Sequence, residues 1–238
     1  MMLADVAAYF IPKKISHEII VANDGSKDKT TEVALKEGSK LGLNLVVVEY
    51  PKNRGKGGAV RAGMSLVRGK YALMLDADGA TTFSELEHVW KRMDELKKVR
   101  GNNLVMVVGS RRIAEGDKKV ERKWHRKFIA YVFKMVITLL LGIDSKDTQC
   151  GFKLFTKESS KMLFKTLHIE RFAFDVELFF LCNRFRIATG EVGVEWRDVD
   201  GSKLSIVDAS VNMFRDVLMI RLYYLLGLWK YSDSVMVK

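Results

Sequence analysis

The amino-acid sequence predicts an α/β fold with a mostly parallel sheet, formed as a single domain over residues 1–238. Three apolar runs rich in β-branched residues, near 17–22, at 45–49 and at 73–76, recur about every 25 residues. Helical patterns at 31–41 and 59–67 separate these runs. Strands that alternate with helices in this way form a parallel sheet covered on both faces. A hydrophobic fraction of 48% supplies enough apolar side chains for a sizeable core.

The chain carries a strong positive charge. Its 40 Lys and Arg residues outnumber 29 Asp and Glu residues, which gives a formal net charge of +11. This balance attracts phosphates, whether of nucleic acid, anionic lipid or a phosphorylated substrate. A basic run at 118–127 lies beside long apolar segments rather than among interleaved aromatic residues, which argues against nucleic acid. Cys150 and Cys182 lack a zinc-binding spacing, so we expect a reduced compartment and no structural metal.

Residues 1–14 lack the basic start, apolar core and small-residue cleavage site of a signal peptide. Met2, Leu3, Val6 and Phe10 follow helical spacing, which predicts one core-facing helix. The sheet is expected to begin after this helix.

Polar side chains follow the first two strands. Asn23 and Asp24 end the first strand, and a glycine-rich loop at 51–58, with Arg54 and Lys56, follows the second. Glycines let the backbone approach a ligand, and the cations, with the dipole of the next helix, offer positive charge to phosphates. Because parallel strands end at the same edge of a sheet, these side chains are expected to line one crevice. A solvated basic turn is the alternative for the loop by itself.

Two carboxylates, Asp76 and Asp78, end the third strand within the stretch 71–82. Side chains two residues apart on a strand share a face, so both are expected in the same crevice. Two hard oxygen donors there suit Mg²⁺ or Mn²⁺ carrying a substrate diphosphate. A strand-to-loop exit with solvated acids is the alternative for an isolated Asp-x-Asp pair.

The second half of the chain combines cations with apolar segments. A fourth strand at 104–108 leads to Arg111, which is expected at the same crevice. A basic run then precedes the apolar run 128–143, which is short of the ~20 residues that a bilayer span needs. Apolar residues punctuated by arginines recur at 211–229. We therefore expect membrane-interface helices at 118–143 and 211–229. Ordinary buried helices are the alternative.

Asp147 and Asp175, with Glu177 close to the latter, are candidates for a catalytic base or for orienting an acceptor. Helix capping or salt bridging accounts for the same acids equally well. A phosphate acceptor weakens the need for a base, because a second pKa near ~6 leaves it largely ionised at neutral pH. Catalysis then depends on cations that hold two anionic phosphates close together. The candidates for binding the acceptor phosphate are Arg111, Arg122, Arg126 and Lys203.

Six motifs follow one another along the chain: VANDGSKDKT, KNRGKGGAVRAG, LMLDADGATT, VVGSRR, DTQCGFKLF and RFAFDVEL. In this order they resemble the family 2 inverting glycosyltransferases, and most of all the dolichyl-phosphate β-glucosyltransferase branch. The resemblance implies a GT-A fold, UDP-glucose as donor, dolichyl phosphate as acceptor, and Mg²⁺ or Mn²⁺ on Asp76 and Asp78. It also implies the cytosolic face of the endoplasmic reticulum membrane and a role in N-glycan precursor assembly. The nucleotide-sugar site would comprise Asn23, Asp24, Arg54, Lys56 and Asp76.

Two features depart from the family pattern. The family opens with a strand ending in a Pro-Ser-Tyr-Asn-Glu type motif, preceded in this branch by a membrane anchor, and neither is found in this sequence. We therefore expect a chain that starts inside the following helix. Asn23 stands where the family usually has Asp, which keeps hydrogen bonding but removes one charge.

We therefore expect an inverting transferase in which a phosphate oxygen of dolichyl phosphate attacks the anomeric carbon of UDP-glucose. A polyprenyl-phosphate glycosyltransferase for mannose or another sugar is one alternative. A phosphatase of the haloacid dehalogenase type is another, because LDADGATT is similar to its Asp-x-Asp-Gly-Thr loop, but the chain has no Asp-Asp pair downstream. A catalytically silent membrane-surface protein that binds lipid phosphates is the third.

Overall fold

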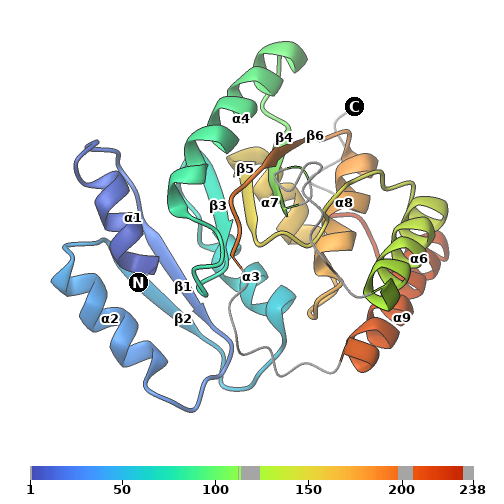
Figure 1. Ribbon diagram of the computed structural model, residues 1–238, viewed down its shortest axis with the longest axis horizontal. Coiled ribbons are helices and arrows are strands. Elements are labelled where there is room, and N and C mark those ends of the chain that lie inside the picture. Colours follow the sequence, from blue (N-terminus) through green and yellow to red (C-terminus); the bar gives the residue numbers. More distant parts are fainter. Residues whose placement is uncertain (1, 112, 114–123, 198–205, 233–238) are drawn as a thin grey trace.

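The computed structural model describes residues 2–111, 113, 124–197 and 206–232, with the backbone alone for 124–130 and 206–210. Figure 1 shows strands at the centre of the molecule and helices on both sides of them. The predicted α/β class is therefore confirmed.

The first half of the chain alternates helices and strands as expected. Its elements are α1 (Met2–Phe10), β1 (Ile19–Asn23), α2 (Thr30–Lys40), β2 (Leu45–Glu49), α3 (Lys56–Ser65) and β3 (Tyr71–Leu75). Strands β1 and β2 form a parallel pair, with Ile19 opposite Leu45 and Asn23 opposite Glu49. Helix α2 packs on both strands and α3 packs on β1.

The second half completes a separate four-stranded sheet in the order β3-β5-β4-β6. Its elements are η1 (Phe83–Glu85), α4 (Leu86–Arg100), β4 (Val105–Ser110), α6 (Trp124–Leu141), β5 (Phe152–Thr156), α7 (Lys157–Thr166), α8 (Phe174–Phe185), β6 (Ala188–Gly193) and α9 (Ile206–Leu225). Strands β4 and β6 are parallel, whereas β5 runs against both β3 and β4. Three of these four strands thus share one direction, and β5 is the exception to the expected parallel arrangement.

The core forms two apolar layers, one on each face of the four-stranded sheet. Helix α4 covers one face, and α7 and α8 cover the other. Strand β4 alternates between them, because Val105 and Val107 belong to the α4 layer and Met106 and Val108 to the opposite layer. Burial on both faces explains why the start of β4 reads as a continuous apolar run.

Helix α3 begins at Lys56, earlier than the predicted start at 59, so the last glycines of the glycine-rich loop form its first turn. This first turn lies very close to another segment of backbone. A Cβ atom on Gly57 would lie 2.5 Å from the carbonyl oxygen of Ile169, so only glycine fits there. The amino terminus of α3, with its partial positive charge, consequently lies inside the predicted phosphate loop.

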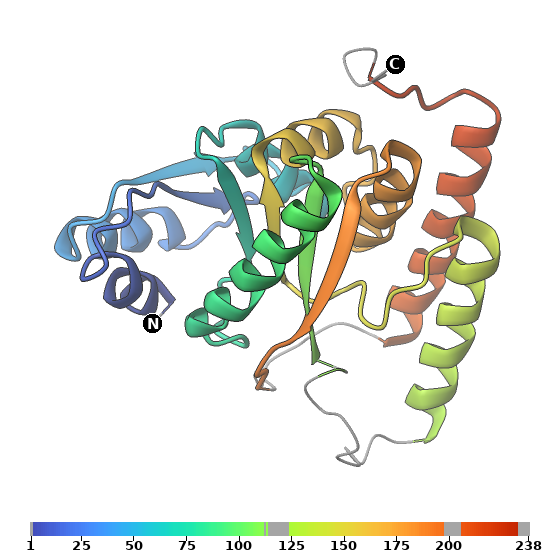
Figure 2. The ribbon, with the colours of Figure 1, turned by 90° about the horizontal axis from the view of Figure 1, so that it is seen from above.

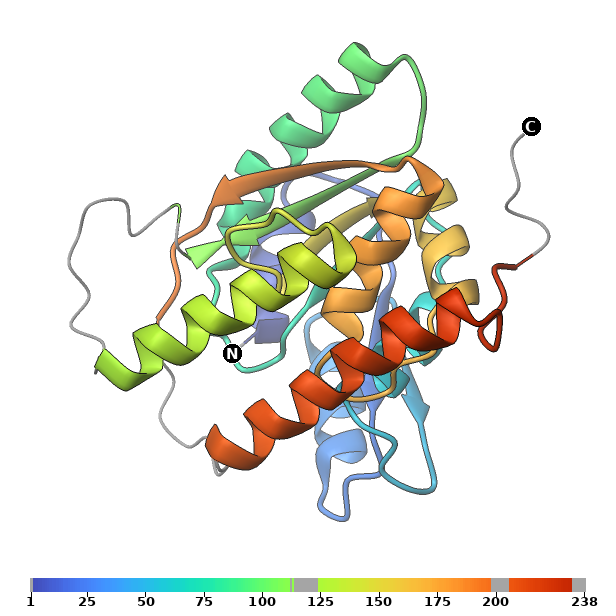
Figure 3. The ribbon, with the colours of Figure 1, turned by 90° about the vertical axis from the view of Figure 1, so that its right-hand side faces the viewer.

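Helices α6 and α9 lie side by side on one flank of the molecule (Figure 3). Seen from above, they form an outer layer beyond α8 (Figure 2). They contain most of the predicted interface segments 118–143 and 211–229, of which residues 118–123 lie outside the described part of the chain. Within that part, no helix combines the length and apolar character needed to span a bilayer.

Candidate functional site

Asp24, at the end of β1, holds the glycine-rich loop. Its carboxylate accepts hydrogen bonds from the backbone N–H groups of Arg54 at 2.7 Å and Gly55 at 2.8 Å. Neighbouring Asn23 is buried and organises the turn after β1, because its amide accepts from Ser26 N–H and donates to Thr31. Both residues therefore shape the backbone around the predicted nucleotide-sugar site. The carboxylate of Asp24 is largely committed to the loop backbone.

Glu170, just before α8, holds the same loop from the other side. Its carboxylate forms an ion pair with Arg54 and a second one with Arg61, whose Nη2 lies 3.3 Å from Oε1. Its backbone carbonyl accepts the N–H of Gly58 at 3.0 Å. The guanidinium of Arg54, predicted to face phosphates, is therefore oriented by a residue 116 positions away.

Lys56 and Asp76 connect the loop to the end of β3. Lys56 Nζ lies 2.7 Å from Asp76 Oδ2, and both side chains are partly exposed. The backbone N–H of Asp76 donates to the carbonyl of Gly151, and the nearest heavy atoms to a Cβ built on Gly151 are those of the Asp76 carboxyl group. Gly151 is thus the residue that leaves room for this carboxylate.

Asp78 follows Asp76 on the exposed loop after β3, and its carboxylate accepts the N–H of Ala80 at 2.9 Å. The described residues contain no cluster of three or more His, Cys, Asp or Glu side chains that would enclose a metal by themselves. Two carboxylates at a solvent-accessible edge nevertheless fit Mg²⁺ or Mn²⁺, because these hard cations are commonly held by one or two carboxylates together with substrate phosphates and water.

Lys153 and Asp175 form a buried ion pair beneath this edge. Lys153 Nζ, on β5, lies 2.7 Å from Asp175 Oδ1 and donates to the carbonyl of Cys150 at 2.6 Å. Burial raises the pKa of Asp175, while the positive charges of Lys153 and Lys56 act in the opposite direction. The side chain of Asp175 is only 4% exposed, and its carboxylate accepts a hydrogen bond from Lys153.

Arg111 and Asp147 form a further ion pair at this edge. Arg111 Nε and Nη2 donate to the two Asp147 oxygens at 2.7 and 2.8 Å, and the Arg111 backbone N–H also donates to Oδ2. Burial alone would raise the pKa of Asp147, but the hydrogen bonds and charge of Arg111 outweigh it and hold that pKa below its usual value. Both carboxylate oxygens of Asp147 thus accept hydrogen bonds from the Arg111 guanidinium.

Trp196 links the Arg111 side of the site to the aspartate loop. The Arg111 guanidinium lies 5.3 Å from the centre of the Trp196 ring. Trp196 pairs with Thr81 in an isolated bridge, and Arg197 N–H donates to the carbonyl of Ala80. Arg111 and the Asp76–Asp78 loop therefore lie at one edge of the four-stranded sheet, which we call the carboxyl edge.

The structure describes no side chain for three of the predicted acceptor residues. Arg122 and Lys203 lie outside the described residues, and for Arg126 the backbone of α6 is described without its side chain. Sequence reasoning missed Gly151, Lys153, Glu170 and Trp196. The motif DTQCGFKLF contains the first two, but their partners lie far away in the sequence.

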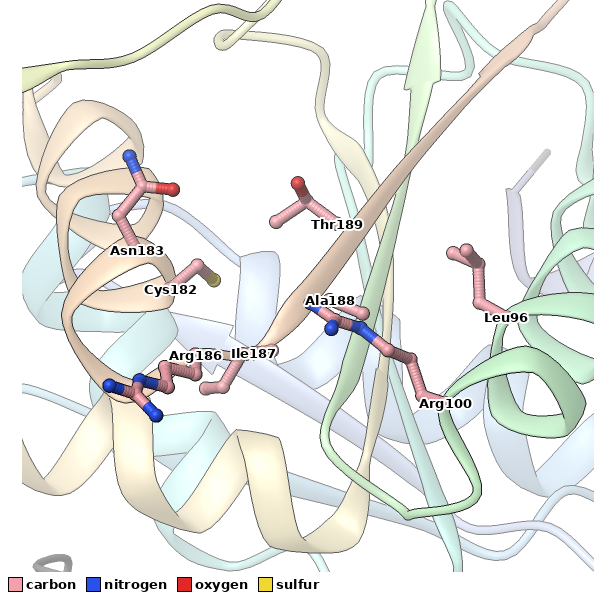
Figure 4. A pocket seen from close by; sticks show the side chains of 8 residues that line it. All are labelled: Leu96, Arg100, Cys182, Asn183, Arg186, Ile187, Ala188 and Thr189. Carbon is pink, nitrogen blue, oxygen red and sulfur yellow. The ribbon is translucent and has the colours of Figure 1, made fainter.

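A hollow of about 490 Å³ lies among α4, α8 and the start of β6 (Figure 4). Arg100, Arg186 and Thr189 are among its lining residues. It lies at the beginning of β6, whereas Arg111 follows the end of β4. Because β4 and β6 are parallel, this hollow is at the opposite edge of the sheet from the carboxyl edge.

The flank made by α6 and α9 exposes an apolar surface. On α6, Tyr131, Met135 and Leu139 are exposed, and on α9 the exposed residues include Leu218, Leu222 and Leu225. Spacings of three and four residues place each set along one side of its helix. We call these six residues the apolar flank.

Comparison with protein families gives a match to Glycosyl transferase family 2 over residues 3–164. Among curated relatives, the chain is 44% identical to "Dolichyl-phosphate beta-glucosyltransferase" of Dictyostelium discoideum, over 91% of this chain and 66% of the relative. It is 40% identical to the human protein of that name, over 98% of this chain and 74% of the relative. The protein of that name in Saccharomyces cerevisiae is 38% identical, over 97% of this chain and 72% of the relative.

Solved structures with the same fold are more distant in sequence. Mannosyl-3-phosphoglycerate synthase from Rubrobacter xylanophilus aligns with a TM-score of 0.62 at 16% identity, over 99% of this chain and 73% of that one. Glucosyl-3-phosphoglycerate synthase from Mycobacterium tuberculosis was solved with Mn²⁺, uridine diphosphate and phosphoglyceric acid. It aligns with a TM-score of 0.55 at 19% identity, over 97% of this chain and 74% of that one. These likenesses support the GT-A fold.

Proposed function

The chain belongs to glycosyltransferase family 2, in the branch of the dolichyl-phosphate β-glucosyltransferases, and on this premise we propose that it transfers glucose from UDP-glucose to dolichyl phosphate. A phosphate oxygen of the lipid forms the new bond to the anomeric carbon as the bond to UDP breaks, and UDP leaves with the electron pair. Attack opposite the leaving group gives the β-linked product. The observation that carries the proposal is one edge of the sheet that presents Asp76 and Asp78 together with Arg111.

The donor binds, in this proposal, on the side of the glycine-rich loop. Lys56 and the amino terminus of α3 supply positive charge to the diphosphate, and Asp24 and Glu170 hold the loop in shape. Asn23 organises the adjoining turn. Because Lys56 also pairs with Asp76, the loop and the end of β3 contact the same diphosphate.

Asp76 and Asp78 would hold the divalent ion, Mg²⁺ or Mn²⁺. When bound, such an ion neutralises charge that develops on the departing diphosphate. Below it, the Lys153–Asp175 pair fixes β5 against α8. We propose that Asp175 stabilises this arrangement and is not the catalytic base.

The acceptor phosphate binds at Arg111 in this proposal, with Arg122, Arg126 and Lys203 as further candidates. Asp147 positions the Arg111 guanidinium through two hydrogen bonds. Proton abstraction is unnecessary, because the lipid phosphate is already largely ionised at neutral pH. Arg111 instead lowers the repulsion between the two phosphate groups.

The apolar flank would lie on the membrane that carries the lipid acceptor. Apolar side chains on one side of a helix bury into the headgroup region, and basic residues such as those at 118–127 are attracted to anionic lipids. A cytosolic nucleotide sugar then reaches the site from the water side. We propose the cytosolic face of the endoplasmic reticulum as this location and N-glycan precursor assembly as the use of the product.

Transfer of label from UDP-[¹⁴C]glucose to dolichyl phosphate, measured as chloroform-soluble product with Mn²⁺ present, tests the proposal. We expect glucose to be transferred, and mannose from GDP-mannose not to be. Asp76→Asn should lower the rate by about 100-fold or more with an unchanged circular dichroism spectrum, since it removes charge at the leaving diphosphate. Preferred mannose transfer would establish the other polyprenyl-phosphate activity. Absence of transfer by a folded chain that binds dolichyl-phosphate vesicles would establish the silent lipid-phosphate binder.

A further inference from the structure

Glu177, on α8, carries a fully buried carboxylate that no step of the proposed reaction uses. It accepts hydrogen bonds from the backbone N–H groups of His168 at 3.0 Å and Ile169 at 2.6 Å, and from the hydroxyl of Tyr224 at 2.7 Å. A buried carboxylate is costly unless strong donors surround it. The two backbone donors therefore fix 168–169 at one place relative to α8.

The segment 168–170 in turn packs against the glycine-rich loop. The carbonyl of Glu170 accepts the N–H of Gly58, and its carboxylate pairs with Arg54. The carbonyl of Ile169 lies so close to Gly57 that no side chain would fit between them. A shift of 168–170 is consequently transmitted to the loop by direct contact.

Tyr224 brings α9 into the same network. Burial and the adjacent Glu177 carboxylate raise the pKa of Tyr224, so its hydroxyl keeps its proton and donates. Beyond the end of α9, the Trp229 ring stacks on the His168 imidazole, with centroids 4.6 Å apart and planes within 7°. These contacts therefore connect the α9 region to the backbone that supports the loop.

We propose that Glu177 is a positioning residue for the donor: by holding 168–170 it sets the conformation of the glycine-rich loop, and through Tyr224 it ties that loop to α9. The inference rests on the proposed function for the identity of the donor. If Glu177 acts in this way, losing the hydrogen bond from either side, at Glu177 or at Tyr224, weakens nucleotide-sugar binding. Acceptor binding at Arg111 is unaffected.

The experiment measures UDP-glucose affinity by calorimetry with Mn²⁺ present, and the KM values of donor and acceptor. Glu177→Gln should weaken UDP-glucose binding by about tenfold and Tyr224→Phe by about threefold, in line with losing a charged and a neutral hydrogen bond. The donor KM should rise to match, and the acceptor KM should stay within twofold. Tyr223→Phe is the matched control, because within the described residues its hydroxyl has no hydrogen bond. It should leave the donor affinity unchanged.

Glu170→Gln keeps the test decisive if Glu177→Gln fails to fold, because Glu170 is partly exposed and acts on the loop directly. It should produce the same donor-specific loss. Wild-type affinity in Tyr224→Phe and Glu170→Gln would overturn the inference while leaving the proposed function intact. A rise in both KM values together would show that Glu177 acts only on stability. Failure of the unaltered chain to bind UDP-glucose would overturn the proposed function itself.

Discussion

Arg111 and Asp147 form an ion pair in which the anion is the more buried partner, with side chains 5% exposed for Asp147 and 30% for Arg111. The carboxylate therefore determines where the guanidinium lies. Asp147→Asn should raise the acceptor KM by about tenfold, because a neutral amide holds Arg111 less firmly. Arg111→Ala should raise it further, and the donor KM should change little in both variants. Equal effects on both KM values would assign Arg111 to the nucleotide side.

The same pair makes stability depend on pH. Asp147 has a pKa below its usual value in the folded protein, so it stabilises the folded state above its unfolded pKa of about 3.9, and this contribution disappears as pH falls through the folded pKa. Asp147→Asn should lower the free energy of unfolding by about 1–3 kcal/mol at pH 7. Urea unfolding at decreasing pH should show that difference shrinking below about pH 4. A pH-independent difference would mean that packing, and not charge, is lost.

At the level of residues, the sequence identified side chains that directly follow strands. It missed side chains whose partners are distant in the sequence. Asp76, Asp78 and Arg111 stand at strand ends, where periodicity alone places them. Glu170 acts on Arg54 across 116 positions, and Lys153 meets Asp175 across 22. No local pattern encodes such pairs. The sequence marks Asp147 and Asp175 as candidates for a catalytic base. Their ion-pair partners in the structure, Arg111 and Lys153, are the reason we propose positioning roles for both.

Helix α3 offers two glycines with opposite expected responses to alanine. Gly57 contacts the Ile169 backbone, so Gly57→Ala should push α3 and 168–170 apart, destabilising by about 1–3 kcal/mol and raising the donor KM. Gly63, in the same helix, has room for a Cβ, which would make ordinary van der Waals contacts at 3.6 Å with Ala22 and 3.7 Å with Ile20. Gly63→Ala should stabilise by about 0.5–1 kcal/mol through helix propensity. Thermal unfolding and donor KM together check both outcomes. A well-tolerated Gly57→Ala would show that the loop contact is loose.

At the level of elements, the sequence predicted β1 to β4, the helices between the first three strands and the two late apolar helices, but neither β5 nor its direction. A strand buried on both faces reads as the same apolar run whichever way it runs. The return of the chain at Gly151, beside Asp76, decides the direction. The early start of α3 was missed for a related reason, because glycines in a first turn look like a loop until the tertiary contact with Ile169 is known.

The whole molecule separates a polar carboxyl edge from the apolar flank, and Glu177 with Tyr224 lies between them. The α/β class and the existence of two apolar helices follow from the sequence. Their side-by-side packing on one flank depends on tertiary contacts and does not. If this flank meets a bilayer, the outward leucines of α6 and α9 should contribute most of the apolar binding energy.

Cosedimentation with phosphatidylcholine–phosphatidylserine vesicles tests this surface. The triple variant Leu139→Ser, Leu222→Ser, Leu225→Ser should reduce vesicle partitioning by at least about tenfold, because each buried CH₂ contributes ~0.8 kcal/mol and ~1.4 kcal/mol is one factor of ten. Val99→Ser is the control, since Val99 is 82% exposed on α4, outside the apolar flank. It should sediment like the unaltered chain. Undiminished partitioning of the triple variant would remove α6 and α9 from the membrane contact and leave charge as its source. Binding lost equally in both variants would instead indicate a nonspecific effect of lowering surface hydrophobicity.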